Sequence, residues 1–130
     1  MEAGLKKILV AEDNEMNQRL MGVILRKLGH PIEFAGNGQN ACEAYMANPS
    51  EYMLIIMDIH MPIMDGFEAT RRIRQFEAGT GFHVPIIALT ANIYSSDIDE
   101  FRSIGMDDYL AKPLNVELLI QTLRKLGITG

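Results

Sequence analysis

The stretch YMLIIMDIHMPIMDG (residues 52–66) combines an apolar run with a carboxylate at its end. The six residues from Tyr52 to Met57 are apolar, which is typical of a parallel strand covered on both faces. Asp58 follows directly, and Asp65-Gly66 then predicts the N-cap and first turn of a helix. A charge at the end of a buried strand is unfavourable unless partners compensate it. We therefore expect other parts of the chain to supply such partners near Asp58.

Strand and helix patterns alternate along the whole chain of 130 residues. Strict alternation predicts an α/β fold with a parallel sheet and helices on both of its faces. The expected strands are residues 7–11, 32–35, 52–57, 85–89 and 108–111, and the expected helices are residues 14–28, 38–48, 65–76, 95–104 and 115–126.

Two of the expected helices carry apolar residues at helical spacing, which predicts the side that faces the core. In the helix of residues 14–28 these residues are Met16, Leu20, Val23, Ile24 and Leu28. In the last helix they are Val116, Leu119, Ile120 and Leu123.

The composition is that of an ordinary globular domain, with 48% hydrophobic and 22% charged residues. It predicts a single domain over residues 1–130, with a core of about residues 6–127. The net charge of −5 argues against direct nucleic-acid binding, which needs clustered basic charge. No apolar run reaches the roughly 20 residues of a membrane span. The single cysteine, Cys42, cannot form an internal disulfide, and we expect a cytoplasmic location.

Polar side chains follow four of the five expected strands, at the edge where parallel sheets bind ligands. They are Glu12-Asp13-Asn14 after the first strand, Asp58 after the third, Thr90-Ala91 after the fourth and Lys112-Pro113 after the fifth. We therefore expect three acids, a hydroxyl and an ammonium group at one edge of the sheet.

This set of groups indicates a cation and a phosphoryl group. Three neighbouring carboxylates repel one another unless positive charge compensates them. The ligands are oxygen atoms, without His or Cys at ligand spacing, so Mg²⁺ or Mn²⁺ is expected and Zn²⁺ is not. Asp58 could attack phosphorus to give an acyl phosphate, with the metal and Lys112 neutralising charge. The Thr90 hydroxyl could donate to a phosphoryl oxygen.

The same residues resemble the receiver domain of two-component response regulators over essentially the whole chain. The resemblance rests on Glu12-Asp13, Asp58 in MDIHMPIMDG, Thr90-Ala91 in ALTAN and Lys112-Pro113 in YLAKP. It implies a flavodoxin-like, doubly wound (βα)5 fold with a five-stranded parallel sheet in the order 2-1-3-4-5. It also implies phosphoryl transfer to this domain from the phosphohistidine of a sensor histidine kinase or a histidine phosphotransfer protein.

The resemblance assigns roles residue by residue. Asp58 corresponds to the phosphoacceptor, the residue that is modified, and Asp13 to a direct metal ligand. Glu12 corresponds to the second acid, which acts through water, although many family members have Asp in its place. The backbone carbonyl of His60 corresponds to a further metal ligand. Lys112 corresponds to the phosphate-binding lysine, whose bond to Pro113 is cis in the family.

The resemblance also implies a switch and a control of phosphoryl lifetime. Thr90 would capture the phosphoryl oxygen and Tyr109 would turn inward behind it, changing the face of the fourth helix, fifth strand and fifth helix. His60 and Asn92 would flank the water that hydrolyses the acyl phosphate. The stretch VAEDNEMNQRLM (residues 10–21) is similar to receivers attached to hybrid sensor kinases.

Alternative functions remain open at this point. A phosphohydrolase that forms an aspartyl phosphate would resemble Asp-x-Asp, but His60 stands two residues after Asp58 and no cap domain fits within the chain. A degenerate receiver would act only as a binding module, which the complete acid, Thr and Lys set argues against. A flavodoxin-type carrier is excluded, since Glu12 and Asp13 would repel a flavin phosphate. An output domain or a separate downstream protein could read the signal.

Overall fold

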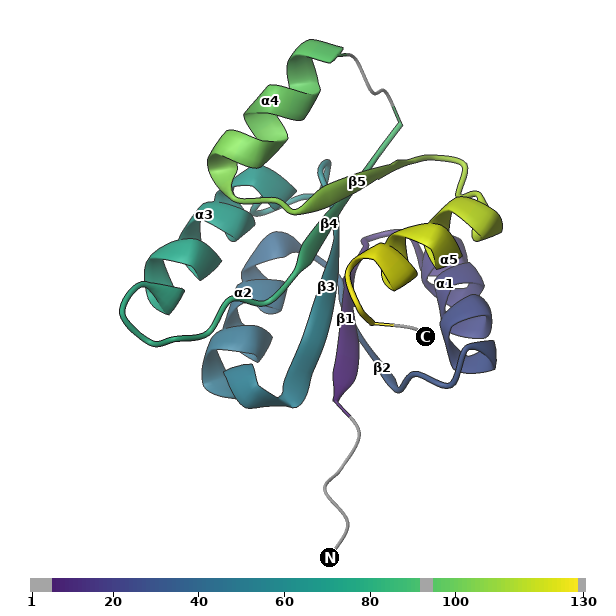
Figure 1. The fold of residues 1–130 in the computed structure, drawn as a ribbon, viewed down its shortest axis with the longest axis horizontal. Coiled ribbons are helices and arrows are strands. Elements are labelled where there is room, and N and C mark those ends of the chain that lie inside the picture. Colours follow the sequence, from purple (N-terminus) through teal and green to yellow (C-terminus); the bar gives the residue numbers. More distant parts are fainter. Residues whose placement is uncertain (1–5, 92–94, 129–130) are drawn as a thin grey trace, which may run out of the picture.

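The computed structural model describes residues 6–91 and 95–128, without the side chains of residues 95–97. Five parallel strands form one sheet in the order β2-β1-β3-β4-β5 (Figure 1), which confirms the predicted fold class. The elements in chain order are β1 (Lys7–Ala11), α1 (Glu15–Lys27), β2 (Ile32–Ala35), α2 (Gly38–Ala47), the 3₁₀ helix η1 (Pro49–Glu51), β3 (Tyr52–Asp58), α3 (Gly66–Glu77), β4 (Ile86–Thr90), α4 (Ser95–Ile104), β5 (Asp108–Ala111) and α5 (Val116–Lys125).

Helices cover both faces of the sheet, α1 and α5 on one side and α2, α3 and α4 on the other (Figure 1). Strand side chains point alternately to the two faces. In β1, Ile8 and Val10 lie in the core under α1 and α5, while Leu9 and Ala11 lie in the core under α2 and α3. Burial on both faces explains why the strand sequences are nearly all apolar.

The predicted element boundaries hold to within one residue. Asp58 and Thr90 are the last residues of β3 and β4, rather than the first residues after them. Asp65 caps α3 as predicted, because its carboxylate accepts a hydrogen bond of 2.9 Å from the backbone N–H of Glu68. The carboxyl ends of the strands therefore carry the polar groups that the sequence places there.

The predicted core-facing side of α1 is wrong for three of its five residues. Met16, Leu20 and Val23 are 79%, 49% and 52% exposed, while Met21 and Leu25 are buried against the sheet. The helix is apolar around much of its circumference, so two neighbouring stripes have the required spacing. The spacing does not say which of the two stripes contacts the sheet. In the structure it is the stripe that contains Met21 and Leu25.

The other predicted core residues of α1 and α5 are buried to different degrees, depending on how close they lie to the sheet. Ile24 and Leu28 of α1 are half-buried and adjoin the core cluster beneath α1 and α5. In α5, Leu119 and Leu123 are buried as predicted, but Val116 is 43% exposed. Val116 is the first residue of its helix, where the chain has only begun to approach the sheet.

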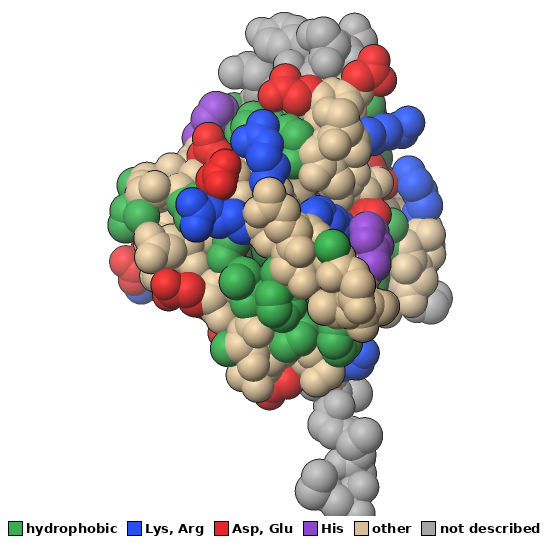
Figure 2. All heavy atoms as spheres, turned by 90° about the vertical axis from the view of Figure 1, so that its left-hand side faces the viewer, with side chains coloured by type: hydrophobic (Ala, Val, Ile, Leu, Met, Phe, Trp, Pro, Cys, Tyr) green, Lys and Arg blue, Asp and Glu red, His purple; other side chains and the backbone are tan. Residues whose placement is uncertain are grey.

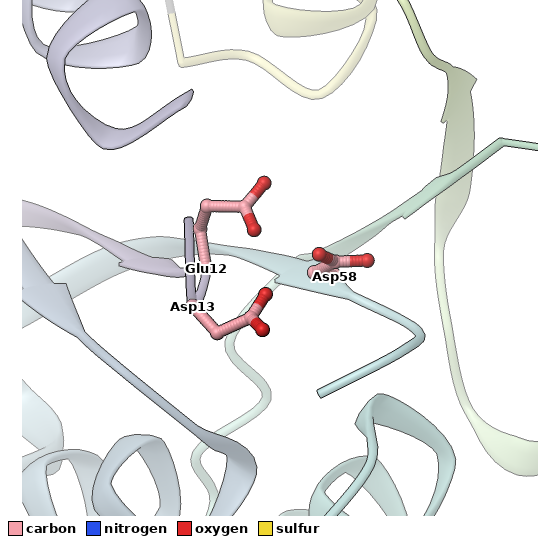
Figure 3. Close-up of side chains that lie close together, drawn as sticks. All are labelled: Glu12, Asp13 and Asp58. Atoms are coloured by element: carbon pink, nitrogen blue, oxygen red, sulfur yellow. The ribbon is translucent and has the colours of Figure 1, made fainter. Parts of the chain in front are cut away.

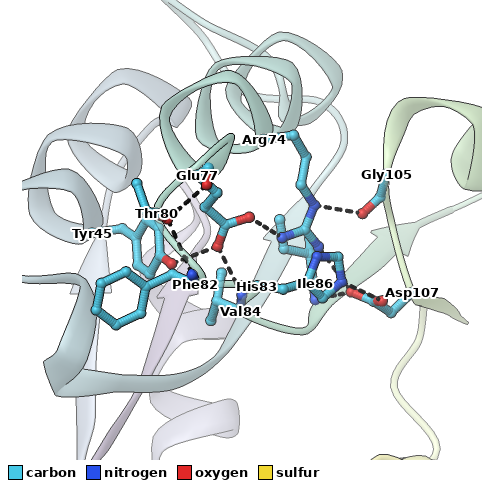
Figure 4. Close-up of polar contacts among 10 residues, drawn as sticks. All are labelled: Tyr45, Arg74, Glu77, Thr80, Phe82, His83, Val84, Ile86, Gly105 and Asp107. Carbon is cyan, nitrogen blue, oxygen red and sulfur yellow. Dashed lines mark hydrogen bonds and ion pairs between the residues drawn. The ribbon is translucent and has the colours of Figure 1, made fainter.

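A polar network joins α3 to α2 and to the beginnings of β4 and β5 (Figure 4). The buried carboxylate of Glu77 accepts from the Tyr45 hydroxyl at 2.5 Å, the Val84 N–H at 2.8 Å and the Arg74 guanidinium at 2.6 Å. Arg74 also pairs with Asp107 at 2.9 Å. Burial, together with the hydrogen bond to Glu77, raises the pKa of Tyr45. The phenol therefore stays protonated and remains a donor to Glu77.

We expect Glu77→Ala to destabilise the fold by about 3 kcal/mol, because a buried hydroxyl, an N–H and part of the Arg74 charge lose their acceptor. Glu68→Ala is the control in the same helix, since Glu68 is partly exposed and pairs with Arg72 on the surface. That change should cost less than about 1 kcal/mol. Urea unfolding of both variants measures the difference. Equal midpoints would show that the Glu77 network does not stabilise the fold.

The surface offers two further observations. Among the described residues no helix has both the length and the apolar character needed to cross a membrane. On the face formed by α2, α3 and α4, acidic and basic side chains are interspersed, and hydrophobic side chains gather in the lower part (Figure 2). The charged side chains on this face do not segregate into one basic patch.

Candidate metal-binding and phosphoacceptor site

Three carboxylates lie together at the carboxyl edge of the sheet (Figure 3). β1 and β3 are neighbours with Ala11 opposite Met57, so the next residues, Glu12 and Asp58, lie side by side. Glu12 is 1% and Asp58 3% exposed, whereas Asp13 is exposed to solvent. One carboxylate oxygen from each of the three lies within 4.8 Å of the others. The sheet register thus creates a site that is buried on one side and open on the other.

Lys112, which follows β5, compensates part of this negative charge. Its Nζ donates to Asp58 Oδ2 at 2.8 Å and to Glu12 Oε1 at 3.0 Å. Burial by itself lowers the pKa of Lys112, but the hydrogen bonds and charges of Asp58 and Glu12 outweigh it, and the pKa is raised. The ammonium therefore stays charged at neutral pH. The bond from Lys112 to Pro113 is cis, as the family resemblance implied.

The backbone after Asp58 is held close to its carboxylate. Asp58 Oδ1 accepts from the His60 N–H at 3.2 Å, and the Gly66 N–H donates to the Ile59 carbonyl at 2.9 Å. A Cβ atom on Gly66 would lie 2.4 Å from the Asp58 carbonyl oxygen, closer than atoms can approach. Glycine at position 66 is therefore required for α3 to start against the end of β3. The His60 side chain is exposed.

The donor set fits a hard divalent cation. The clustered ligand atoms are all carboxylate oxygens, and the ammonium of Lys112 leaves two of their three negative charges uncompensated. Mg²⁺ and Mn²⁺ bind through one or two carboxylates and keep several waters, which suits the exposed position of Asp13. Glu12, Asp13 and Asp58 are the residues of this cluster that would hold such an ion, to which the family resemblance adds the backbone carbonyl of His60.

Of the remaining predicted residues, Thr90 lies at the same edge, whereas Tyr109 is the second residue of β5 and pairs with Ala88 in the middle of β4. Thr90 is buried at the end of β4, opposite Ala111 of β5, and its carbonyl accepts from the Lys112 N–H at 2.8 Å. Tyr109 is half-buried, with its ring centroid 6.2 Å from that of Phe101 in α4. Asn92 lies outside the described residues. The structure thus brings Glu12, Asp13, Asp58 and Lys112 together and puts Thr90 beside them.

Two residues of this site escaped sequence reasoning. Asn17 Nδ2 donates to Glu12 Oε1 at 3.0 Å, and Gln18 Nε2 donates to the Glu12 carbonyl at 2.6 Å. Both belong to the first turns of α1, whose N-cap is Asn14. The sequence does carry a signal for these contacts. The N-cap Asn14 stands only two residues after Glu12, so the first turn of α1 brings the side-chain amides of Asn17 and Gln18 back toward the end of β1.

Residues 8–124 match the family model of the response regulator receiver domain. The chain belongs to this family. Hybrid signal transduction histidine kinase I of Dictyostelium discoideum is 45% identical over 121 residues, which cover 91% of this chain and 7% of that protein. Histidine kinase 1 of Arabidopsis thaliana is 36% identical over 92% of this chain and 12% of that protein. This receiver domain therefore spans a small part of the length of these curated relatives.

Solved structures of receiver domains agree with this assignment. The receiver domain of sensor histidine kinase PA1611 from Pseudomonas aeruginosa, which has a magnesium ion coordinated in its active site cleft, is 38% identical with a TM-score of 0.81, and the match covers 95% of this chain and 99% of that one. The complex of the Saccharomyces cerevisiae histidine phosphotransfer protein Ypd1 with the receiver domain of Ssk1 gives 34% identity and a TM-score of 0.86, covering 95% of this chain and 89% of that one.

Proposed function

We propose that this receiver domain accepts a phosphoryl group on Asp58 from a phosphohistidine, in a reaction that requires Mg²⁺ or Mn²⁺. The observation that carries the proposal is the geometry of Asp58. Its carboxylate ends a rigid buried strand, lies within 4.8 Å of two further acids and accepts a 2.8 Å hydrogen bond from Lys112. A carboxylate fixed in this way is oriented for attack, and Lys112 is within reach of the group that it would receive.

In the transfer, one Asp58 oxygen forms a bond to phosphorus while the bond from phosphorus to the donor imidazole breaks. The electron pair of the broken bond stays on the imidazole nitrogen, and an acyl phosphate results. A divalent ion held by Glu12, Asp13 and Asp58 would supply positive charge for the phosphoryl oxygens. Lys112, whose ammonium already donates to Asp58 at 2.8 Å, would donate to one of these oxygens.

The exposed side of α1 supports the proposed kind of donor. Met16, Leu20 and Val23 face solvent, and a pocket of about 90 Å³ between Leu20 and Pro113 reaches Glu12 and Lys112. Exposed apolar side chains beside a reactive site mark an interaction surface. Because relatives are hybrid histidine kinases and a similar receiver is bound by a histidine phosphotransfer protein, we propose such a protein, or a sensor histidine kinase, as the donor.

The proposal includes a readout of the modified state. Thr90 would donate to the phosphoryl group, Tyr109 would turn inward, and the face of α4, β5 and α5 would present the change to an output domain or a downstream protein. The exposed His60 side chain, with Asn92, would adjust the lifetime of the acyl phosphate by orienting or excluding water. A cytoplasmic location is part of the proposal and is consistent with Cys42 as a free, buried thiol.

The decisive experiment is to incubate the domain with Mg²⁺ and a small acyl-phosphate donor and to map the modified residue by mass spectrometry after reductive trapping. We expect a single labelled residue, Asp58, and label only when a divalent cation is present. Modification of a different residue, or equal labelling in the presence of a chelator, would contradict the proposal.

Thr90→Ala should separate phosphorylation from the readout. We expect Asp58 still to be modified, because Thr90 makes no bond to phosphorus, but the response of α4 and α5 to be largely lost. Backbone NMR shifts measured with and without the phosphoryl group report that response. Thr90→Ser keeps the hydroxyl and is the matched control. If the α5 shifts change equally in Thr90→Ala and Thr90→Ser, the hydroxyl does not transmit the signal.

A further inference from the structure

Glu12 is held more completely than its role as second acid requires. Its carboxylate is buried, and Oε1 accepts from both Asn17 Nδ2 and Lys112 Nζ at 3.0 Å. Oε2 accepts from the Asn14 N–H at 3.2 Å. A carboxylate oxygen has two lone-pair directions. Oε1 is therefore saturated by protein donors, and Oε2 is the oxygen that keeps acceptor capacity for a metal-bound water.

The start of α1 fixes Asn17 in turn. The Asn14 side chain accepts from the Asn17 N–H at 3.0 Å, as an N-cap does, while the Asn14 N–H itself donates to Glu12. Gln18 holds the Glu12 carbonyl oxygen at 2.6 Å. The backbone and the carboxylate of Glu12 are thus both attached to the first turns of α1. Glu12 cannot turn away without breaking bonds at the helix start.

The residue type at position 17 is informative. Asn17 occupies the third position of its helix after the cap, where an acidic side chain would interact favourably with the helix dipole. A carboxylate there would face Glu12 and repel it, whereas an amide donates to it. Glu has one methylene group more than Asp and more rotamers to restrict, and the Asn17 amide adds a restraint on Oε1 to those from Lys112 and the Asn14 N–H.

We propose that Asn17 is a positioning residue of the metal site and acts through Glu12. By occupying Oε1 together with Lys112, it directs Oε2 toward the ion, so that metal affinity depends on an amide of α1 that touches neither the metal nor the phosphoryl group. This inference rests on the proposed function, since it assigns a supporting residue to the same metal site. Outer residues that orient ligands typically change metal affinity by about 10–100-fold when removed.

A double-mutant cycle tests the inference, with Mg²⁺ affinity measured by calorimetry on the unphosphorylated domain. We expect Asn17→Ala to weaken Mg²⁺ binding about tenfold. In a Glu12→Ala background the same change should have no further effect, because the residue through which Asn17 acts is gone. Asn40→Ala is the matched control, since Asn40 holds the same position in α2, is exposed, and is capped by Asn37 in the same way. Its Mg²⁺ affinity should equal that of the wild type.

Three outcomes decide the matter. Coupled losses in Asn17→Ala and Glu12→Ala, with Asn40→Ala unchanged, support the positioning role. Wild-type Mg²⁺ affinity in Asn17→Ala, or losses that add independently in the double variant, overturn it, because a purely structural role of Asn17 would give additive effects. A wild-type domain that binds no Mg²⁺ at millimolar concentration overturns the proposed function itself, which is a distinct result.

Discussion

We expect the largest effect from Asp58→Asn, which should abolish acyl phosphate formation and leave the fold intact. The amide lacks the nucleophilic carboxylate oxygen, and Glu12, the other carboxylate that Lys112 contacts, is held by Asn17 and the Asn14 N–H. Stability should stay the same or increase, since one of three mutually repelling charges is removed. Lys112 keeps its hydrogen bond to Glu12. Phosphorylation is measured by mass spectrometry and stability by urea unfolding.

Asp65→Asn is the matched control for this experiment. It makes the same change seven residues further along, at an exposed residue that ends the loop after β3 and caps α3. Asn caps helices about as well as Asp, so both phosphorylation and stability should match the wild type. Undiminished labelling of Asp58→Asn at a neighbouring residue would remove Asp58 as the acceptor. An unfolded Asp58→Asn protein would show instead that the carboxylate is needed for the fold.

The fold could be predicted from sequence because its signals are local and agree with one another. The run from Tyr52 to Met57 is apolar on both faces, and the same is true of β1 and β4, so only a sheet covered on both sides can bury them. The predicted N-cap Asp65 marks a helix start that the structure reproduces. Strand order followed from the family resemblance rather than from any pattern within a strand.

The site was predictable in its charged residues and not in the residues that support them. Glu12, Asp58 and Lys112 stand at strand ends, and the edge of a parallel sheet collects strand ends wherever the helices lie. The contact of Asn17 with Glu12 depends instead on how α1 is rotated about its axis. Since the sequence favoured the wrong side of α1, with Leu20 turned inward, this contact could not be derived from it.

The rotation of α1 also connects the two proposals for this helix. The rotation of α1 that brings Asn17 Nδ2 within 3.0 Å of Glu12 Oε1 leaves Met16 and Leu20 exposed, and Leu20 lines the pocket that reaches Lys112. One side of α1 thus supports the metal site and the adjacent side is available to the phosphate donor. A partner seated on Leu20 would contact the helix that positions Glu12.

Removing a residue that only orients a metal ligand typically weakens metal binding by about 10–100-fold. Asp13→Ala should weaken Mg²⁺ binding by more than this, because it removes a ligand. Asp13 is the exposed acid of the cluster, and its carboxylate has no hydrogen bond that ties it to Lys112, which bonds to Asp58 and Glu12. It is therefore the acid best able to bind the ion directly. Acyl phosphate formation at millimolar Mg²⁺ should fall with the affinity and recover in part at higher Mg²⁺ or with Mn²⁺.

Glu15→Ala distinguishes direct coordination from general attraction between the cation and negative charge. Glu15 lies two residues further along, carries the same charge, and is 78% exposed in a surface pair with Arg19. An exposed carboxylate that is already paired with an arginine interacts only weakly with a nearby cation through water, so Glu15→Ala should change Mg²⁺ affinity less than about twofold. Calorimetry on the two variants gives the comparison. If Asp13→Ala binds Mg²⁺ as tightly as Glu15→Ala does, Asp13 is not a ligand of the ion.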